Sequence, residues 1–376
     1  MTDVKALLSK AVQVGAAPGF SAAWITSDGA ANTAAAGTLA QGNSTPVGDG
    51  SLFWIASCTK AVTALAALQL VEQGILTLDA PVAAHLPGLA APLVLTGFDQ
   101  AGNPVTRPAK TPITLRHLLC HTSGLGYDFC QPDLARNRSA PNPANGALLV
   151  FEPGEGWTYS VGLDWTGQLI EAASGQPFHQ YLEDHVFAPL GMADTTFFPS
   201  DEQALRQAGM HMRLPDGGVA PIPFALPSEP SPMMGGGGLY STAADYLRFL
   251  RAVLSGGAIG DARILSAAST QTLCHPLISG EHVGVLRTSN PMMSSDFDPF
   301  PGMSKSWSLG FVHNDAPGPA GRSRGSMAWA GLSNCYYWAD PTTNTAGVLL
   351  AQVLPFGDAR IMQVFADFER AVYEHT

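Results

Sequence analysis

Ser57 and Lys60 are the pair of side chains in this 376-residue chain whose types and spacing most directly suggest chemistry. An apolar run precedes them at residues 52–56, and a helical pattern follows at residues 61–71. Residues three apart share one face of a helix, so the spacing holds the lysine amine beside the serine hydroxyl. A serine needs a neighbouring base to become a nucleophile, and a desolvated lysine can be that base. The pattern therefore predicts acyl transfer through an ester of Ser57; the alternative is that Ser57 only caps a helix.

Two later segments contain residues that could assist this pair. Tyr159 follows a turn rich in Pro and Gly, and Trp329-Ala330-Gly331 lies in a late strand-like run. A phenol next to a lysine cation can hold or relay a proton, because the cation favours the phenolate. A glycine such as Gly331 allows close approach of the strand backbone to a ligand. Whether Lys60 or Tyr159 is the base during acylation stays open at this level.

The composition excludes several classes of protein. The chain is 46% hydrophobic and 13% charged, with a formal net charge of −11, which is typical of a compact protein with a large core. No basic patch is available for nucleic acid, and no basic segment adjoins an apolar one to bind an anionic membrane. No apolar run reaches the length of a membrane span. The expected partner is a small molecule.

The cysteines and the N-terminal segment bear on location and cofactors. Five cysteines are scattered along the chain without the spacing of a disulfide framework or a metal site, and no H-E-x-x-H motif occurs. Residues 1–15 form an amphipathic pattern and lack the apolar block of a secretion signal. The prediction is a protein of the reducing cytoplasm, a monomer or small homo-oligomer, with no metal and no cofactor.

The order of helical and strand patterns indicates the architecture. Strands are expected at residues 20–26 and 31–39, joined by the hairpin signal Ser27-Asp28-Gly29, and the helix that begins near Ser57 should end at Gly74. In the middle of the chain, helical patterns fall at residues 114–121, 164–174, 178–187 and 201–209, and a hairpin at 93–107. Towards the end, helices are expected at 242–254 and 358–374, and strands at 307–314, 327–330, 335–339 and 346–353.

This order predicts an α+β fold, in which an antiparallel sheet flanked by helices contains an inserted, mostly helical domain. The expected division is residues 1–75 and 239–376 for the two parts of the α/β domain, with the helical domain and its hairpin at 76–238. Residues 276–306 form a long segment rich in Pro, Met, Ser and Gly. Loops of this length are often functional lids, so we expect this one to border an acyl pocket.

Taken together, these motifs resemble those of the serine β-lactamase and penicillin-binding protein family, and most of all its class C branch and family VIII carboxylesterases. The resemblance rests on the S-x-x-K at residues 57–60, Tyr159, the W-x-G at 329–331, the L-L-x-H-T-S-G-L run ending at Leu125, and the glycine-rich residues 235–242. Residues 95–107 and 159–165 are also similar to the fungal statin acyltransferases of this family. The resemblance covers nearly the whole chain and implies a β-lactamase/DD-peptidase-like fold.

The resemblance also implies roles for particular residues. Ser57 would be the nucleophile, with Lys60 and Tyr159 as proton carriers, and the backbone N–H groups of Ser57 and Leu332 would form the oxyanion hole. The substrate-binding residues implied by the matching motifs and their neighbourhood are Trp329, Ala330, Gly331, Val161, Tyr127 and Gly236. The family's histidine supports a loop, so His121 and His117 are expected to make structural hydrogen bonds, and the glycines at 235–238 to form a tight turn beside the site.

Two departures from the β-lactamase pattern favour a different substrate. Trp329 replaces the lysine of the K-T-G motif, and Val161 replaces the asparagine of the Y-x-N motif. A hydrogen bond to a charged group is worth about 1.5–3 kcal/mol, so the loss weakens binding of an anionic lactam substantially. The prediction is a serine carboxylesterase for short- to medium-chain esters, with weak cephalosporin hydrolysis. The alternatives are an acyltransferase to an alcohol, a β-lactamase or DD-peptidase, and a binding protein without catalytic activity.

Overall fold

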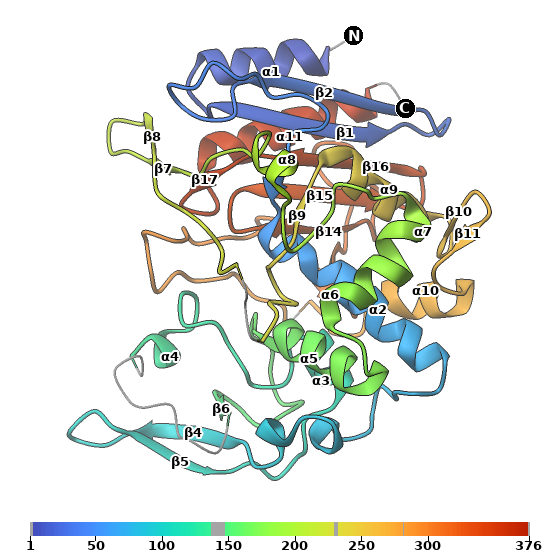
Figure 1. Cartoon of the computed structure of the whole chain (residues 1–376). Helices are drawn as coiled ribbons and strands as arrows, with labels where there is room; N and C mark the ends of the chain where they lie inside the picture. The colour runs from blue at the N-terminus through green and yellow to red at the C-terminus, as the bar shows by residue number, and fades with distance from the viewer. Residues whose placement is uncertain (1–2, 137–146, 229–231, 281, 375–376) are drawn as a thin grey trace.

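A seven-stranded antiparallel sheet forms the centre of the molecule in the computed structural model, which describes residues 3–136, 147–228, 232–280 and 282–374 (Figure 1). Its strands, in spatial order, are β12 (Lys305–Trp307), β13 (Val312–Asn314), β14 (Met327–Gly331), β15 (Cys335–Asp340), β16 (Thr345–Leu350), β1 (Gly19–Ile25) and β2 (Ala31–Gly37). Strand β1 pairs with β16, with Ala23 opposite Val348. The first two strands therefore complete a sheet built mainly from the last third of the chain.

Helices cover both faces of this sheet, which explains why its central strands show no alternation of apolar and polar residues. On one face, Phe368 of α11 (Ala359–Tyr373) packs on Trp338, with ring centroids 5.3 Å apart. On the other, Tyr246 of α9 (Ala243–Leu254) packs on Tyr337 at 5.1 Å. Helix α1 (Val4–Gln13) lies beside α11 (Figure 1). The predicted α+β class is confirmed.

Helix α2 (Thr59–Glu72) connects the sheet to the helical part of the molecule, where it packs against α5 (Gly162–Ser174) (Figure 1). Residues 59–70 are all buried, so this helix is enclosed on every side. The other helices are α3 (Leu115–Leu119), α4 (Pro132–Arg136), α6 (Phe178–Leu182), α7 (Ala188–Leu190), α8 (Asp201–Ala204) and α10 (Ala267–Cys274), with short turns η1 (Ala56–Cys58), η2 (Val82–Ala84), η3 (Pro87–Leu89) and the π-helical η5 (Glu183–Phe187).

Small sheets complete the fold. The predicted hairpin is present as β4 (Leu93–Phe98) and β5 (Pro104–Pro108), which pair antiparallel. The remaining strands are β6 (Leu148–Leu149) beside β4, β3 (Phe53–Trp54) with β9 (Tyr240–Ser241), β10 (Ala258–Ile259) with β11 (Ala262–Arg263), and β7 (His211–Arg213) between β8 (Val219–Pro221) and β17 (Val353–Leu354). None of the described helices combines the length and hydropathy that a bilayer span requires.

Among the differences from the prediction, two concern the extent of an element and one concerns a helix that was not predicted. The strand expected at 307–314 is two strands, because the N–H and hydroxyl of Ser308 bond across a turn to Phe311. The helix expected at 201–209 ends at Ala204, since the N–H of Gly209 donates to the carbonyl of Leu39 instead of continuing the helix. Helix α10, which Ser266 caps, was not predicted at all.

Candidate active site

The backbone around Ser57 is held by neighbours on both sides. Ala56 has φ +44°, a conformation that costs free energy for any residue except glycine. The carbonyl of Ala56 accepts a hydrogen bond from the hydroxyl of Thr59 at 2.7 Å. On the other side, a Cβ atom at Gly331 would collide with the carbonyl oxygen of Ile55. Gly331 therefore permits β14 to lie directly against the turn that carries Ser57.

This contact gives a prediction for stability. Gly331→Ala should lower the free energy of unfolding by about 1–3 kcal/mol, because the added methyl group meets backbone that cannot move independently. Urea denaturation would measure the change. The matched control is Gly48→Ala, because nothing lies within 4 Å of a Cβ atom at that position, so its effect should stay within about 0.5 kcal/mol. Equal effects of the two substitutions would contradict the close approach.

Lys60 lies one helical turn from Ser57 with its amine directed at the serine hydroxyl. Its Nζ is 3.2 Å from the Oγ of Ser57, 3.0 Å from the Oη of Tyr127 and 2.6 Å from the carbonyl oxygen of Gly236. Only 2% of the lysine is exposed. Burial lowers its pKa to about 8, although the nearby carboxylate of Asp164 acts in the opposite direction. At pH 7 about a tenth of this lysine is therefore an uncharged amine, far more than for an ordinary lysine.

Tyr159 lies on the opposite side of the same serine. Its Oη accepts a hydrogen bond from Nε1 of Trp329 at 3.2 Å, and Nζ of Lys60 is 4.9 Å from the centre of its ring. Burial raises the pKa of Tyr159, and hydrogen bonds with Ser57 and Trp329 counteract only part of that effect. The phenol is therefore neutral in the resting site and can donate a proton to an adjacent oxygen.

His121 and His117, the two histidines expected to have a structural role, both make hydrogen bonds within the protein. Nδ1 of His121 is 2.9 Å from the hydroxyl of Ser160 and accepts from the N–H of Ser160 at 3.2 Å. Burial, and then the charge of Lys60, lower the pKa of His121 well below its usual value, so it is neutral. His117 completes a capping box with Thr114 at the start of α3. Both histidines make structural hydrogen bonds, as the sequence predicted.

Asp164 is part of the site, although no sequence motif indicated a role for it. Its Oδ2 accepts a hydrogen bond from Tyr127 at 3.2 Å, and its Oδ1 accepts from the N–H of Gly236 at 2.8 Å. Tyr127 and Gly236 are the same groups that accept hydrogen bonds from the amine of Lys60. A Cβ atom on Gly236 would lie 2.8 Å from the Asp164 carboxylate, so the network requires glycine there. Tyr127 and Gly236 thus hold the lysine, and their expected contact with the substrate stays a prediction.

A small apolar hollow opens beside Ser57. It is lined by Ser57, Phe129, Tyr159, Leu286, Trp329, Ala330, Leu332 and Phe356. Val161 is not among these residues; it is partly buried, and its carbonyl accepts from the N–H of Asp164 at the start of α5. Leu286 belongs to the long loop at 276–306, which therefore borders the hollow as predicted. Phe129 and Phe356 had no sequence signal, because each lies more than 70 residues from Ser57 in a segment without a motif.

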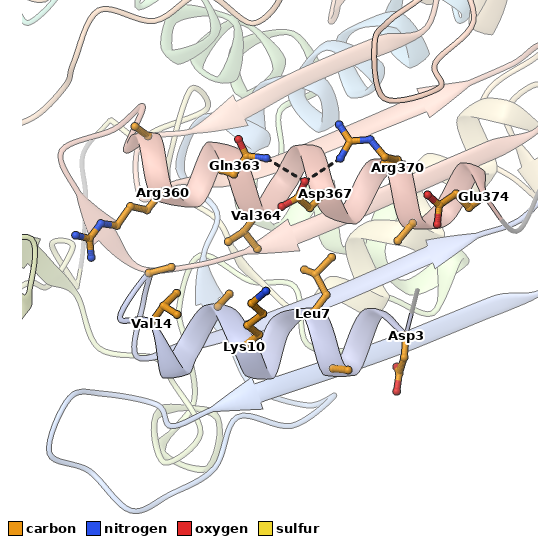
Figure 2. A pocket seen from close by; sticks show the side chains of 15 residues that line it. Asp3, Leu7, Lys10, Val14, Arg360, Gln363, Val364, Asp367, Arg370 and Glu374 are labelled. Atoms are coloured by element: carbon orange, nitrogen blue, oxygen red, sulfur yellow. Dashed lines mark hydrogen bonds and ion pairs between the residues drawn. The ribbon is translucent and has the colours of Figure 1, made fainter. Parts of the chain in front are cut away.

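The hollow measures about 10 Å³, which is about the space of one water molecule. A much larger groove, about 990 Å³, lies between α1 and α11 (Figure 2), but it contains none of the candidate catalytic residues. Within that groove Asp367 accepts hydrogen bonds from Gln363 and Arg370 (Figure 2). The chemistry of Ser57 is therefore not located at the larger groove.

An antiparallel sheet covered by helices, with a serine and a buried lysine at the start of the helix beneath it, defines the class of the serine β-lactamases and penicillin-binding proteins. The chain belongs to the beta-lactamase family, whose model matches residues 4–369.

An esterase and an acyltransferase are among the relatives of this chain. The chain is 30% identical to lovastatin esterase of Penicillium rubens over 363 residues, covering 89% of this chain and 88% of that protein. It is 32% identical to monacolin J acid methylbutanoyltransferase of Aspergillus terreus over 342 residues, covering 85% and 81%. The unliganded structure of simvastatin synthase (LovD) from Aspergillus terreus superposes with a TM-score of 0.84 at 28% identity, covering 99% of this chain and 97% of that one.

Proposed function

We propose that this protein is a serine carboxylesterase that hydrolyses short- to medium-chain esters through an acyl-Ser57 intermediate. The observation that carries the proposal is the buried Lys60 amine, with a pKa of about 8, 3.2 Å from the Ser57 hydroxyl at the edge of an apolar hollow. The relatives include both an esterase and acyltransferases, which supports acyl chemistry at this serine.

The proposed reaction begins when Oγ of Ser57 attacks the carbonyl carbon of the ester and its proton passes to Nζ of Lys60. The resulting oxyanion accepts hydrogen bonds from the N–H groups of Ser57 and Leu332, both of which line the hollow. Tyr159 then protonates the departing alcohol and recovers a proton from Lys60. Water attacks the acyl-enzyme in the second half of the reaction and regenerates Ser57. Lys60 is the acylation base in this scheme, because burial lowers its pKa whereas burial raises that of Tyr159.

The chemistry of the hollow favours an uncharged, apolar acyl group. Trp329 stands where a β-lactamase presents a lysine to the substrate carboxylate, and it directs its indole N–H at Tyr159 instead. Phe129, Leu286 and Phe356 reduce the hollow to about 10 Å³, so an acyl chain can enter only when these side chains move. Leu286 lies on a long loop without strands or helices of its own between 276 and 304 in the described part, so its displacement disrupts no helix or strand.

Acyl transfer to an alcohol is the second candidate function, and the specific observation in its favour is the 32% identity to a methylbutanoyltransferase. Both activities share the acyl-enzyme and differ only in whether water or an alcohol attacks it. We further propose, from the five free cysteines, that the protein acts in a reducing compartment such as the cytoplasm.

One experiment tests the proposal and separates the alternatives. Turnover of p-nitrophenyl butyrate would be compared with that of a chromogenic cephalosporin, each with and without an added alcohol. The esterase proposal predicts faster turnover of the ester and butyric acid as the main product. Faster cephalosporin turnover would identify a lactamase, and butyrate ester of the added alcohol as the main product would identify an acyltransferase. No turnover of either substrate would favour a binding protein.

The Asp164 network gives a further prediction. Asp164→Asn should move the pH dependence of ester turnover towards lower pH, because the carboxylate charge that raises the pKa of Lys60 is removed. The turnover number should also fall, by about ten-fold, since the amide has only one acceptor oxygen for the two groups, Tyr127 and the N–H of Gly236, that the carboxylate orients. The pH–rate profile of the variant measures both effects. Asp133→Asn, on the exposed helix α4, is the control and should change neither. An unchanged profile in Asp164→Asn would show that Asp164 has no electrostatic influence on Lys60.

A further inference from the structure

The segment that carries Tyr159 has no secondary structure of its own to hold it in place. Residues 157–160 belong to no helix or strand. The backbone N–H groups on either side of Tyr159 both donate to His121. That of Thr158 meets the carbonyl oxygen of the histidine at 3.0 Å, and that of Ser160 meets its Nδ1 at 3.2 Å. One residue therefore holds the tyrosine backbone from both sides.

His121 reaches both N–H groups through an unusual backbone conformation. Its φ is +61°, in the left-handed region that few residues other than glycine and asparagine adopt. Such a conformation costs free energy, persists only where the surrounding structure fixes it, and is concentrated in functional sites. Here it directs the carbonyl group and the ring of one residue towards the same segment, as the two hydrogen bonds show. The strained backbone thus serves the segment that carries Tyr159.

The imidazole of His121 acts as an acceptor at Nδ1. The hydroxyl of Ser160 accepts from the N–H of Gly162 at 3.2 Å and lies 2.9 Å from Nδ1. Because Nδ1 already accepts from the N–H of Ser160, it carries no proton, and the hydroxyl donates to it as well. The proton of the ring is therefore on Nε2. Since burial keeps the pKa of His121 well below its usual value, the ring stays neutral and does not exchange protons with the reacting groups.

Aromatic rings fix the imidazole in this orientation. Its centre lies 4.9 Å from the ring of Tyr159 and 4.9 Å from that of Trp307, and His121 is fully buried. A ring enclosed in this way cannot turn towards another partner. The hydroxyl end of Tyr159 is held separately, by the indole N–H of Trp329 at 3.2 Å. The phenol therefore has two points of support, and His121 supplies the one at its backbone.

We propose that His121 is a positioning residue for the ester hydrolysis proposed above: it keeps the phenol of Tyr159 where its proton reaches the departing alcohol. The inference rests on that proposed function. As the C–O bond breaks, the proton passes from Tyr159 to the alkoxide oxygen, and Lys60 returns one to the phenolate. An alkyl alcohol leaves poorly without this proton, whereas p-nitrophenolate leaves without it. His121 therefore matters for esters of alkyl alcohols far more than for activated aryl esters.

The test compares ethyl butyrate with p-nitrophenyl butyrate, because both give the same butyryl enzyme and kcat/KM reports its formation. His121→Gly accepts the positive φ and removes the acceptor at Nδ1. It should lower kcat/KM for ethyl butyrate about 100-fold, but that for the p-nitrophenyl ester less than about five-fold. Tyr159→Phe should give the same pattern, since it lacks the proton donor itself. His121→Asn also tolerates this φ and offers an acceptor oxygen, so it should stay within about ten-fold of the parent for ethyl butyrate.

His117→Asn is the matched control. The ring of His117 hydrogen bonds to Thr114 at the start of α3 instead of to the segment that carries Tyr159. Its loss should leave kcat/KM for both esters within about two-fold of the parent, even where it lowers the melting temperature. A general loosening of the fold would lower both rates alike, so a difference between the two esters identifies the positioning role.

Equal losses with the two esters in His121→Gly would overturn the positioning role and leave the esterase proposal intact. A parent protein that does not hydrolyse ethyl butyrate would overturn it too, and failure with both esters would also end the esterase proposal. If His121→Gly does not fold, Ser160→Ala decides, because it removes the hydroxyl bond to Nδ1. A loss of about five-fold with ethyl butyrate alone supports the proposal, and equal losses or none contradict it.

Discussion

Replacing Ser57 with alanine should reduce the turnover of p-nitrophenyl butyrate by a factor on the order of 10⁴ to 10⁶. Every step of the proposed reaction passes through an ester of Ser57, and neither Lys60 nor Tyr159 can take over as the attacking group at a carbonyl carbon in this hollow. Stopped-assay mass spectrometry should show the butyryl adduct on the wild-type chain and none on the variant.

The control substitution is the adjacent Cys58→Ala. Cys58 is 2% exposed, and burial raises the pKa of its thiol well above the usual value, so it is not a thiolate nucleophile. Its loss should change turnover only about two- to three-fold, through packing. Full activity in Ser57→Ala, or a butyryl adduct on Cys58, would refute the mechanism.

The second large effect concerns pH. Wild-type ester turnover should rise with pH and level off above about 8, because only the uncharged form of Lys60 can accept the serine proton and the pKa of that lysine is about 8. Below this pH the protonated fraction grows, and the rate should fall about ten-fold for each pH unit. Lys60→Met should lose a factor of about 10²–10⁴ at pH 8 and no longer show this rise.

Two comparisons isolate the role of the amine. Lys60→Arg should be as inactive as Lys60→Met, because arginine cannot lose its proton. Lys5→Met, which removes an exposed lysine of α1, should leave the profile unchanged. A wild-type profile that is flat from pH 6 to 10 would contradict the role of Lys60 as the base, and one that rises only at pH 10 or above would instead point to Tyr159.

Much of the fold was predictable, because local signals agree with the final structure. Thr242 and Asp358 each cap a helix by accepting backbone N–H groups, and both helices begin where the sequence indicates. Asp3 caps α1 in the same way, within the segment 1–15 for which the sequence indicated a helix. Glycine at Gly74 follows the end of α2 with a positive φ, as expected. One error falls where a long-range contact decides the element: the contact of Gly209 with Leu39 replaces a helix that local propensity would continue.

The site was predictable to the extent that spacing along a helix or strand determines it. Ser57 and Lys60 meet because they are one turn apart, and Trp329 reaches Tyr159 as the motif order implied. Asp164 was within reach of the same reasoning, since it is an acidic residue in the first turn of the helix that follows Tyr159. Its partnership with Tyr127 was not, because only the tertiary fold brings α5 and the preceding loop together.

The pairing of β1 with β16 has a consequence for biosynthesis. Trp329 leaves the ribosome about 270 residues after Ser57, which corresponds to roughly 15 to 55 s at ordinary rates of translation. Throughout that interval α2, whose residues 59–70 are buried in the finished molecule, is covered only by the helices made before the last strands, such as α5 and then α10. Part of the apolar surface of α2 is therefore exposed to aggregation until the last third of the chain has been synthesised. We expect its yield in cells to depend on slow synthesis or on chaperones, more than its final stability would suggest.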